Sequence, residues 1–257
     1  MIVFAGPSLA GASGVPDGIE MRPPAQQGDV YLASLETPAA IGIIDGYFEG
    51  VPSVWLKEIL WALKRGIPVL GASSMGALRA AELDIFGMIG VGMVYALYRD
   101  GVLEDDDEVA LVHGPAEVGY PGLSLAMVSA RATLDAAVRD GVLTADQAAA
   151  LASGAKSQFY KQRTWDSILR VTDVGKADAV FRSWLADNEV DQKRADALAL
   201  LQRLVEGRYE PPVVDFHFEE TALWHDAVQL WRQRQREAGA PREYRYRVTG
   251  GLSFRDM

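Results

Sequence analysis

The stretch Ile41–Leu83, IGIIDGYFEGVPSVWLKEILWALKRGIPVLGASSMGALRAAEL, decides the fold. Its first residues, Ile41–Ile44, are apolar and mostly β-branched, which predicts a buried strand ending in a turn at Asp45. Pro52 and Ser53 then predict a helix start, and apolar residues recur at helical spacing up to the following Arg-Gly pair. The opening half of the stretch therefore predicts a strand followed by a helix.

A second strand and a second helix follow directly. Ile67–Leu70 predicts the strand, and Gly71–Gly76 forms the turn into a helix over Ala77–Leu83. Strand, helix, strand and helix in this order predict a parallel βαβ unit. Because parallel strands end at one edge of the sheet, the loop after Ile44 and the turn at Ser73–Ser74 should lie near each other. Ligands bind at that edge in open α/β folds.

The rest of the chain divides into a strand-containing part and a helical part. Met1–Ala5 and Ile19–Arg22 predict strands, and Val109–His113 predicts the last strand of the sheet. The predicted fold class is therefore α/β, a mainly parallel sheet flanked by helices and followed by an α-helical C-terminal region. Helices are expected over Asp29–Glu36, Gly87–Asp100, Leu123–Arg139, Thr144–Ser153, Ser157–Arg170, Lys176–Asn188, Asp191–Val205 and Ala222–Glu237.

We expect residues 1–120 to form the α/β core with the catalytic site. Residues 121–257 should form a helical region and a C-terminal tail that together offer a surface for partner docking. The tail from Ala238 onward carries several arginines and is expected to be a hairpin or partly disordered. Trp55, Ile59 and Leu63 are expected to pack onto the sheet. The buried strand residues are expected to be Val3, Phe4, Ile43, Ile44, Val69 and Leu70.

Composition excludes several classes of function. The chain has no cysteine, which excludes disulfides, thiolate zinc sites and cysteine nucleophiles. Its net charge of −10 has the wrong sign for a dedicated nucleic-acid binder. No apolar run reaches membrane-spanning length, and Met1–Ala5 has no signal-peptide pattern. We therefore expect a cytoplasmic protein that binds neither nucleic acid nor membrane.

The turn at Ser73 and Ser74 carries the strongest chemical signal. A serine on a sharp strand-to-helix turn, with Gly76 soon after, is typical of a nucleophile elbow. The hydroxyl would project above the sheet, and the Met75 N–H would face a developing oxyanion at the helix N-terminus. Ser8, after the first strand, could donate a second N–H to that oxyanion or belong only to a turn. The alternative for the serine pair is that one of them simply caps the helix.

A nucleophilic serine needs a base, and His113 and Lys57 are the candidates. His113 is at the end of an expected strand and could face the site. Lys57 falls in the first turn of the predicted helix, where the macrodipole disfavours a cation, and burial would lower its pKa further. The alternative is an ordinary solvated lysine. Asp45 could orient Lys57, or close a turn with Gly46.

Metal and phosphate sites are less well supported. The acidic run Glu104–Glu108 could chelate a divalent ion, but consecutive acids point in different directions, so we expect a solvated loop. The sequence GPSLAGASG matches neither a Walker A loop nor a dinucleotide fingerprint. We expect no metal and no cofactor.

The chain contains four notable segments: FAGPSL at Phe4–Leu9, the block Ile43–Leu83, GMIGVGMVY at Gly87–Tyr95 and DDDEVALVHGP at Asp105–Pro115. Together these segments resemble the TfuA family, over about Val3 to Thr164, whereas the C-terminal third resembles it only loosely. The resemblance implies a protein that accompanies a YcaO-type enzyme, which uses ATP to convert a backbone amide of a precursor or target peptide to a thioamide. It implies that this protein hydrolyses the C-terminal thiocarboxylate of a ThiS-like sulfur carrier, releases hydrosulfide and helps YcaO engage the peptide.

The resemblance also implies a Ser–Lys pair. The serine falls at Ser73 or Ser74, and we choose Ser74 because Gly76 follows two residues later; the lysine falls at Lys57. A chain without cysteine agrees with sulfur that arrives on a carrier and leaves as a small anion. The alternatives are a non-catalytic adaptor that docks YcaO to its peptide or carrier, and an unrelated serine esterase.

Overall fold

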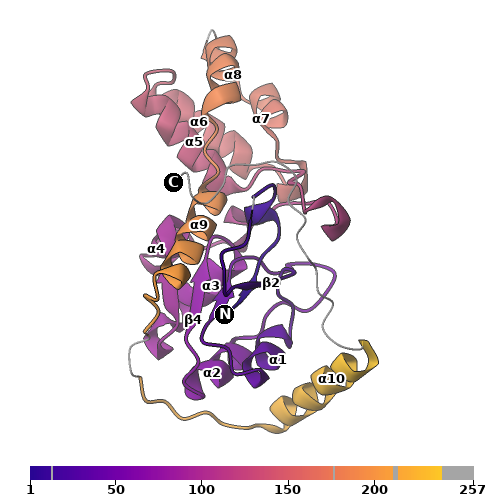
Figure 1. The fold of residues 1–257 in the computed structure, drawn as a ribbon. Helices are drawn as coiled ribbons and strands as arrows, with labels where there is room; N and C mark the ends of the chain where they lie inside the picture. Colours follow the sequence, from indigo (N-terminus) through magenta and orange to yellow (C-terminus); the bar gives the residue numbers. More distant parts are fainter. Residues whose placement is uncertain (13, 176, 211–213, 239–257) are drawn as a thin grey trace.

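The computed structural model describes residues 1–12, 14–175, 177–210 and 214–238. Its centre is a five-stranded sheet in the order β2-β1-β3-β4-β5, with every neighbouring pair parallel (Figure 1). This is one of the two common doubly wound orders, and the strand order reverses between β1 and β3. The strands are β1 (Ile2–Phe4), β2 (Glu20–Arg22), β3 (Ile41–Ile43), β4 (Val69–Ala72) and β5 (Ile89–Val91).

Three helices cover one face of the sheet: α1 (Asp29–Leu35), α2 (Leu56–Lys64) and α3 (Met75–Leu83). Their apolar residues pack with alternate strand residues, as the period of two along a strand requires. The expected burial of the strand residues is confirmed, because Val3, Phe4, Ile43, Ile44, Val69 and Leu70 are all buried. Ile59 and Leu63 pack with this face of the sheet, as expected.

The other face is covered by α9 (Gln192–Val205), which returns from the C-terminal part of the chain. A Cβ on Gly42 would lie 3.0 Å from a methyl carbon of Leu200, so β3 has a glycine where the helix comes closest. Leu201 and Leu204 complete the contact with the sheet. α4 (Gly92–Arg99) packs between α3 and α9.

The remaining helices form a separate cluster and an outlying helix. α5 (Met127–Arg139), α6 (Ala145–Lys156), α7 (Trp165–Val171) and α8 (Ala177–Asn188) share one apolar core beyond the end of the sheet (Figure 1). α10 (Ala222–Ala238) reaches α1 and α2 through buried aromatic rings, chiefly Trp224 and Trp231. The helical part is therefore divided between its own core and the two sides of the α/β core.

Two expected sheet assignments are wrong. Val109–His113 is not a strand of the sheet; His113 only forms an isolated antiparallel bridge with Gly122. The fifth strand is instead Ile89–Val91, within the expected helix Gly87–Asp100. Gly87 and Gly92 have φ of 97° and 91°, which a continuous right-handed helix does not allow, so the strand lies between them.

Some helix boundaries and contacts also differ. α2 begins at Leu56 rather than after Ser53, because the Glu58 carboxylate accepts the Trp55 N–H at 2.8 Å and fixes the first turn there. Trp55 packs with the rings of α10 rather than on the sheet. The expected helix 157–170 is interrupted, and α7 starts at Trp165 after a Thr164 cap. The expected hairpin or disorder from residue 239 onward lies outside the described residues. Within the described ranges, no helix has the length and apolarity needed to cross a membrane.

Candidate active site

The loops that follow β1, β3 and β4 meet where the strand order reverses, which is where ligands bind in doubly wound sheets. Asp45, after β3, is buried and organises this point. One carboxylate oxygen accepts the N–H groups of Gly6 and Ser8 at 2.8 and 3.0 Å, and the other accepts the Ser8 hydroxyl at 2.6 Å. Asp45 therefore fixes the β1 loop, and neither of its two expected roles, orienting Lys57 or closing a turn with Gly46, describes these contacts.

Ser73 joins the same hydrogen-bond chain. Its hydroxyl donates to Ser8 Oγ at 2.8 Å, and the Ser8 hydroxyl in turn donates to the Asp45 carboxylate. Ser73 has φ of 68°, an uncommon value for a residue with a side chain, so the turn between β4 and α3 is held in a strained conformation. Ser73 is completely buried. Its side chain thus links the turn to the β1 loop through the hydrogen bond to Ser8.

Ser74 is the N-cap residue of α3 and lines a small cavity above the sheet. It makes no side-chain capping bond, and Ser73 donates to Ser8, so neither serine has the simple capping role. The turn is tight because two glycines are in contact. A Cβ on Gly76 would lie 1.7 Å from the Ile43 carbonyl oxygen, and one on Gly71 would lie 2.0 Å from the Gly76 carbonyl oxygen. The glycines therefore bring the positive end of α3 onto the strand ends.

Lys193, at the start of α9, lines the same cavity and is buried. Its ammonium group donates to the Val109 carbonyl at 2.8 Å and lies 3.9 Å from an Asp45 carboxylate oxygen. Burial lowers the pKa of Lys193, and the carboxylates of Asp45 and Asp191 oppose that shift. A buried lysine with a lowered pKa can supply a neutral amine near Ser74.

Lys57 is not among the residues that line the cavity. Its ammonium group instead lies 3.3 Å from Thr221 Oγ1 and 5.3 Å from the centre of the Phe218 ring, in the segment that leads into α10. On α2, Ile59 faces the sheet, and a residue two positions earlier on a helix points to the opposite side. The expected juxtaposition of Lys57 and Ser74 is therefore corrected: the cavity lysines are Lys193 and Lys161.

His113 also lines the cavity, although it does not end a strand of the sheet. Its Nδ1 lies 2.8 Å from the Gly114 carbonyl oxygen, which can only accept, so Nδ1 carries the proton. In the neutral ring Nε2 is then an acceptor. The His113 ring packs near Tyr47 and Tyr120, with centroids 6.3 and 5.5 Å away.

Of the expected oxyanion donors, only the helix N-terminus fits. The Ser8 N–H donates to Asp45, so it is not directed at a substrate. The Gly76 N–H donates to the Ile44 carbonyl at 3.3 Å. Met75 begins α3, and its N–H belongs to the first turn of the helix, where backbone donors have no partner within the helix. The cavity at this point has a volume of about 200 Å³, which suits a narrow chain end rather than a bulky ligand.

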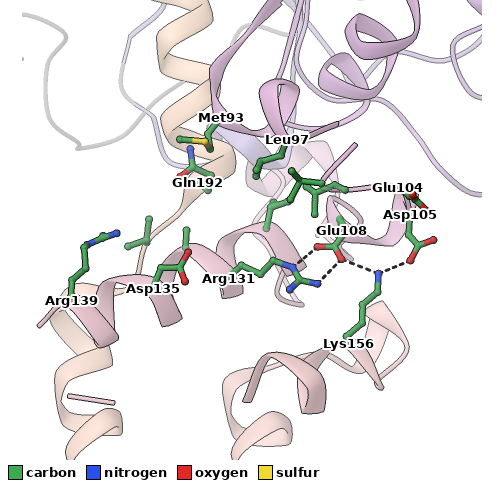
Figure 2. A pocket seen from close by; sticks show the side chains of 15 residues that line it. Met93, Leu97, Glu104, Asp105, Glu108, Arg131, Asp135, Arg139, Lys156 and Gln192 are labelled. Atoms are coloured by element: carbon green, nitrogen blue, oxygen red, sulfur yellow. Dashed lines mark hydrogen bonds and ion pairs between the residues drawn. The ribbon is translucent and has the colours of Figure 1, made fainter. Parts of the chain in front are cut away.

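The acidic run Glu104–Glu108 is not simply a solvated loop. Glu108 is buried and paired with Arg131 at 2.9 Å, and Lys156 bridges to Glu108 and Asp105 (Figure 2). The buried Arg163 pairs with Asp107 at 2.8 Å. These basic partners come from α5, α6 and the loop after α6. Because they are distant in sequence from the acidic run, the sequence alone does not show that the acids are paired. In the described part of the chain, no group of His, Asp and Glu side chains is arranged to hold a metal ion.

The fold and the cavity define an α/β protein with serine and lysine side chains at the switch point of its sheet. Residues 45–164 match the family model described as TfuA-like protein, so this segment is similar to that family. No curated protein matches the chain. The matched segment contains Asp45, Ser74 and Lys161, whereas Ser8 and Lys193 reach the cavity from outside it.

Sequence reasoning missed Lys193, Lys161 and Tyr160. Lys193 is in an expected helix whose sequence has no distinguishing motif, and only the packing of α9 on the sheet brings it to Asp45. Tyr160 and Lys161 lie within the expected helix Ser157–Arg170, and in such a helix both would be predicted to be surface residues. The only feature of the sequence that could have pointed to Lys193 is its position in the first turn of a predicted helix. Lys57 has the same feature, so it does not distinguish the two lysines.

Proposed function

We propose that this chain hydrolyses the C-terminal thiocarboxylate of a ThiS-like sulfur carrier, with Ser74 as nucleophile and Lys193 as general base. The hydrosulfide released would serve a YcaO-type enzyme that forms a thioamide in a peptide backbone. The observation that carries the proposal is that the buried Lys193, whose pKa is lowered, lines the same cavity as Ser74. The substrate class is the one that the resemblance to the TfuA family implies, and the model of that family matches residues 45–164.

The chemistry balances with water as the only co-substrate. Neutral Lys193 takes the Ser74 proton as Ser74 Oγ bonds to the thiocarboxyl carbon, and the first turn of α3 stabilises the oxyanion. The carbon–sulfur bond then breaks, and the lysine proton goes to the departing sulfur, giving hydrosulfide and an acyl-serine ester. Lys193 next activates a water molecule that cleaves the ester, which regenerates Ser74 and leaves the carrier with a carboxylate.

Asp45 has a positioning role in this scheme. Its carboxylate stabilises the Lys193 ammonium after proton transfer, and through Ser8 and Ser73 it holds the turn that presents Ser74. Both serines are buried, but Ser74 lines the cavity, whereas the Ser73 hydroxyl is already directed at Ser8. Ser73 is therefore the poorer nucleophile candidate.

The test uses the purified chain, a thiocarboxylated carrier and an assay for free sulfide. Ser74→Ala should lower the rate by about 10³-fold or more, and Lys193→Met, which retains the apolar stem, should do the same. Lys57→Ala should retain the parent rate. The rate should rise with pH along a limb that lies below the ordinary lysine pKa of 10.5, and Lys193→Met should remove that limb. Circular dichroism verifies the fold of each variant.

Two outcomes would change the assignment. If Lys57→Ala loses activity and Lys193→Met keeps it, the general base is Lys57 rather than Lys193. Normal sulfide release by Ser74→Ala would exclude Ser74 as the nucleophile. If a Ser74→Ala/Lys193→Met variant still supports thioamidation by YcaO at the parent rate, the chain is a docking adaptor rather than a hydrolase.

A further inference from the structure

Two segments far apart in the chain meet at the mouth of the Ser74 cavity. Glu49 belongs to the loop after β3, and Tyr160 and Lys161 belong to a short 3-10 helix before α7. The Tyr160 hydroxyl donates to one Glu49 carboxylate oxygen at 2.7 Å, and the Lys161 ammonium group pairs with the other. All three residues line the cavity together with Ser74 and Lys193.

The contact of Glu49 with Tyr160 and Lys161 is one that another carboxylate can replace. The side chains of Glu49 and Lys161 are 52% and 44% exposed, and an exposed ion pair of this kind adds little stability. The donors, in contrast, are held in place. The Lys161 ammonium lies over the rings of Phe159 and Tyr160, 5.6 and 5.7 Å from their centres. Nearby, Arg163 is completely buried and bonded to Asp107, which anchors the segment.

We propose that Tyr160 and Lys161 bind the anionic end of the substrate, and that Glu49 occupies these donors until the substrate displaces it. The proposal rests on the proposed function only in taking the substrate to be a chain that ends in a carboxylate or thiocarboxylate. A phenol O–H and an ammonium that together hold both oxygens of one carboxylate can hold the two terminal atoms of another. Charge-assisted bonds of this kind favour an ionised terminus over a neutral one.

The charges that line the cavity also favour an anionic ligand. With Glu49 displaced, the cavity is lined by the partly exposed Lys161 and the buried Lys193, and the N-terminus of α3 lies beside Ser74. Asp45 is the other acid that lines the cavity, and its carboxylate already accepts the N–H groups of Gly6 and Ser8 and the Ser8 hydroxyl. The volume of about 200 Å³ admits a slender chain end.

Binding is measured without chemistry, by NMR titration of the labelled protein with acetyl-triglycine and with its C-terminal amide. The wild-type protein should bind the carboxylate about tenfold more tightly than the amide. Lys161→Gln should abolish this preference, and Tyr160→Phe should reduce it. Glu49→Gln should tighten carboxylate binding several-fold, because it removes the competing charge. Lys64→Gln is the matched control, since the Lys64 side chain is also 44% exposed but pairs with Asp215 on another surface.

Equal binding of acid and amide by the wild-type protein, or an unchanged preference in Lys161→Gln, would overturn the proposal. Ser74→Ala should keep the preference for the carboxylate, because binding precedes attack. A protein that prefers the carboxylate but releases no sulfide would contradict only the proposed function. Sulfide release with an unchanged KM in Lys161→Gln would overturn the proposal that Lys161 binds the substrate and would leave the proposed function intact.

Discussion

Asp45 is the residue on which the geometry of the site depends most directly. Its carboxylate accepts three hydrogen bonds from the β1 loop and faces the Lys193 ammonium across 3.9 Å, with both side chains buried. Removing one member of a buried pair leaves the other charge without compensation, which costs more than the pair contributes. Asp45 is therefore a structural support for the cavity as well as part of its charge balance.

Asp45→Asn should lower the free energy of unfolding by about 3 kcal/mol, because it leaves Lys193 buried without a counter-charge. The measurement is equilibrium urea unfolding. Asp100→Asn, which disturbs the exposed pair with Arg99, should change stability by less than about 0.5 kcal/mol. Adding Lys193→Met to Asp45→Asn should restore part of the loss, whereas additive losses would show that the two side chains do not interact.

At the scale of single elements, the βαβ unit was predictable and its distant contacts were not. Ile41–Ile44, Ile67–Leu70 and the turn at Ser73 carry local signals of period and turn chemistry. The structure confirms both strands and the turn, although β4 runs two residues later than expected, from Val69 to Ala72. β5 was missed because a three-residue strand has too few positions to establish a period of two. The prediction of a sheet strand at Val109–His113 was wrong because the end of this run pairs with a neighbouring segment instead of the sheet. Val112 accepts the Leu123 N–H, and His113 forms a bridge with Gly122.

The same reasoning explains what was recognised of the site. Asp45 and the two serines follow predicted strands, so topology alone brings them together. The basic residues around them, Lys193 and Lys161, come from helical segments whose packing depends on contacts distant in sequence. Lys57 satisfied every local criterion for a lysine base, but its helix turns it toward the segment before α10.

Gly76→Ala tests the close contact between α3 and the sheet. Alanine ordinarily favours a helix over glycine by about 1 kcal/mol. Here its Cβ would lie 1.7 Å from the Ile43 carbonyl oxygen, a backbone atom that cannot move aside. The net effect should be a destabilisation of about 3 kcal/mol in thermal or urea unfolding. Gly122→Ala, whose Cβ meets no atom closer than 4.0 Å, should be nearly neutral, and equal effects of the two would refute the packing argument.

Glu58 links α1 to α2 and should make stability depend on pH. Its buried carboxylate accepts N–H groups from Gly28, Val30, Tyr31 and Trp55. Burial is the largest cause that raises its pKa from 4.5 to about 7, and the backbone donors oppose it. The folded protein therefore holds this proton more tightly than the unfolded chain. The resulting stabilisation is complete below pH 4.5 and is lost as the pH rises through about 7.

The free energy of unfolding should accordingly fall by about 3 kcal/mol between pH 4.5 and pH 8 from this group. Asp29, whose pKa is raised to about 6 mainly by burial, acts in the same direction. Urea unfolding across this range measures the slope. Glu58→Gln should flatten it, and Glu82→Gln, at an exposed pair with Arg79, should leave it unchanged. A slope that survives Glu58→Gln would assign the effect to another group.

At the scale of the whole molecule, α10 is held by one aromatic cluster on the outer side of α1 and α2 (Figure 1). Trp224 and Trp231 are buried there against Tyr31, with ring centres 5.5 Å from it in both cases. Trp231 lies so close to Gly28 that a Cβ at that glycine would be 2.6 Å from the indole ring. The Trp61 Nε1–H is buried without an acceptor among the described residues, which costs part of what the packing contributes.

Trp231→Ala should release α10 while the α/β core stays folded. Truncating a buried tryptophan removes about 3–5 kcal/mol of packing. Because α10 contacts the core chiefly through this cluster, that loss should appear as local opening rather than as lower stability of the sheet. Trypsin should then cut at Arg232, Arg234 and Arg236 under native conditions, with little change in the urea midpoint of the core. Leu230→Ala, at a neighbouring exposed side chain, should leave cleavage slow. If Trp231→Ala instead lowers the core midpoint in step with cleavage, α10 and the sheet unfold as one cooperative unit.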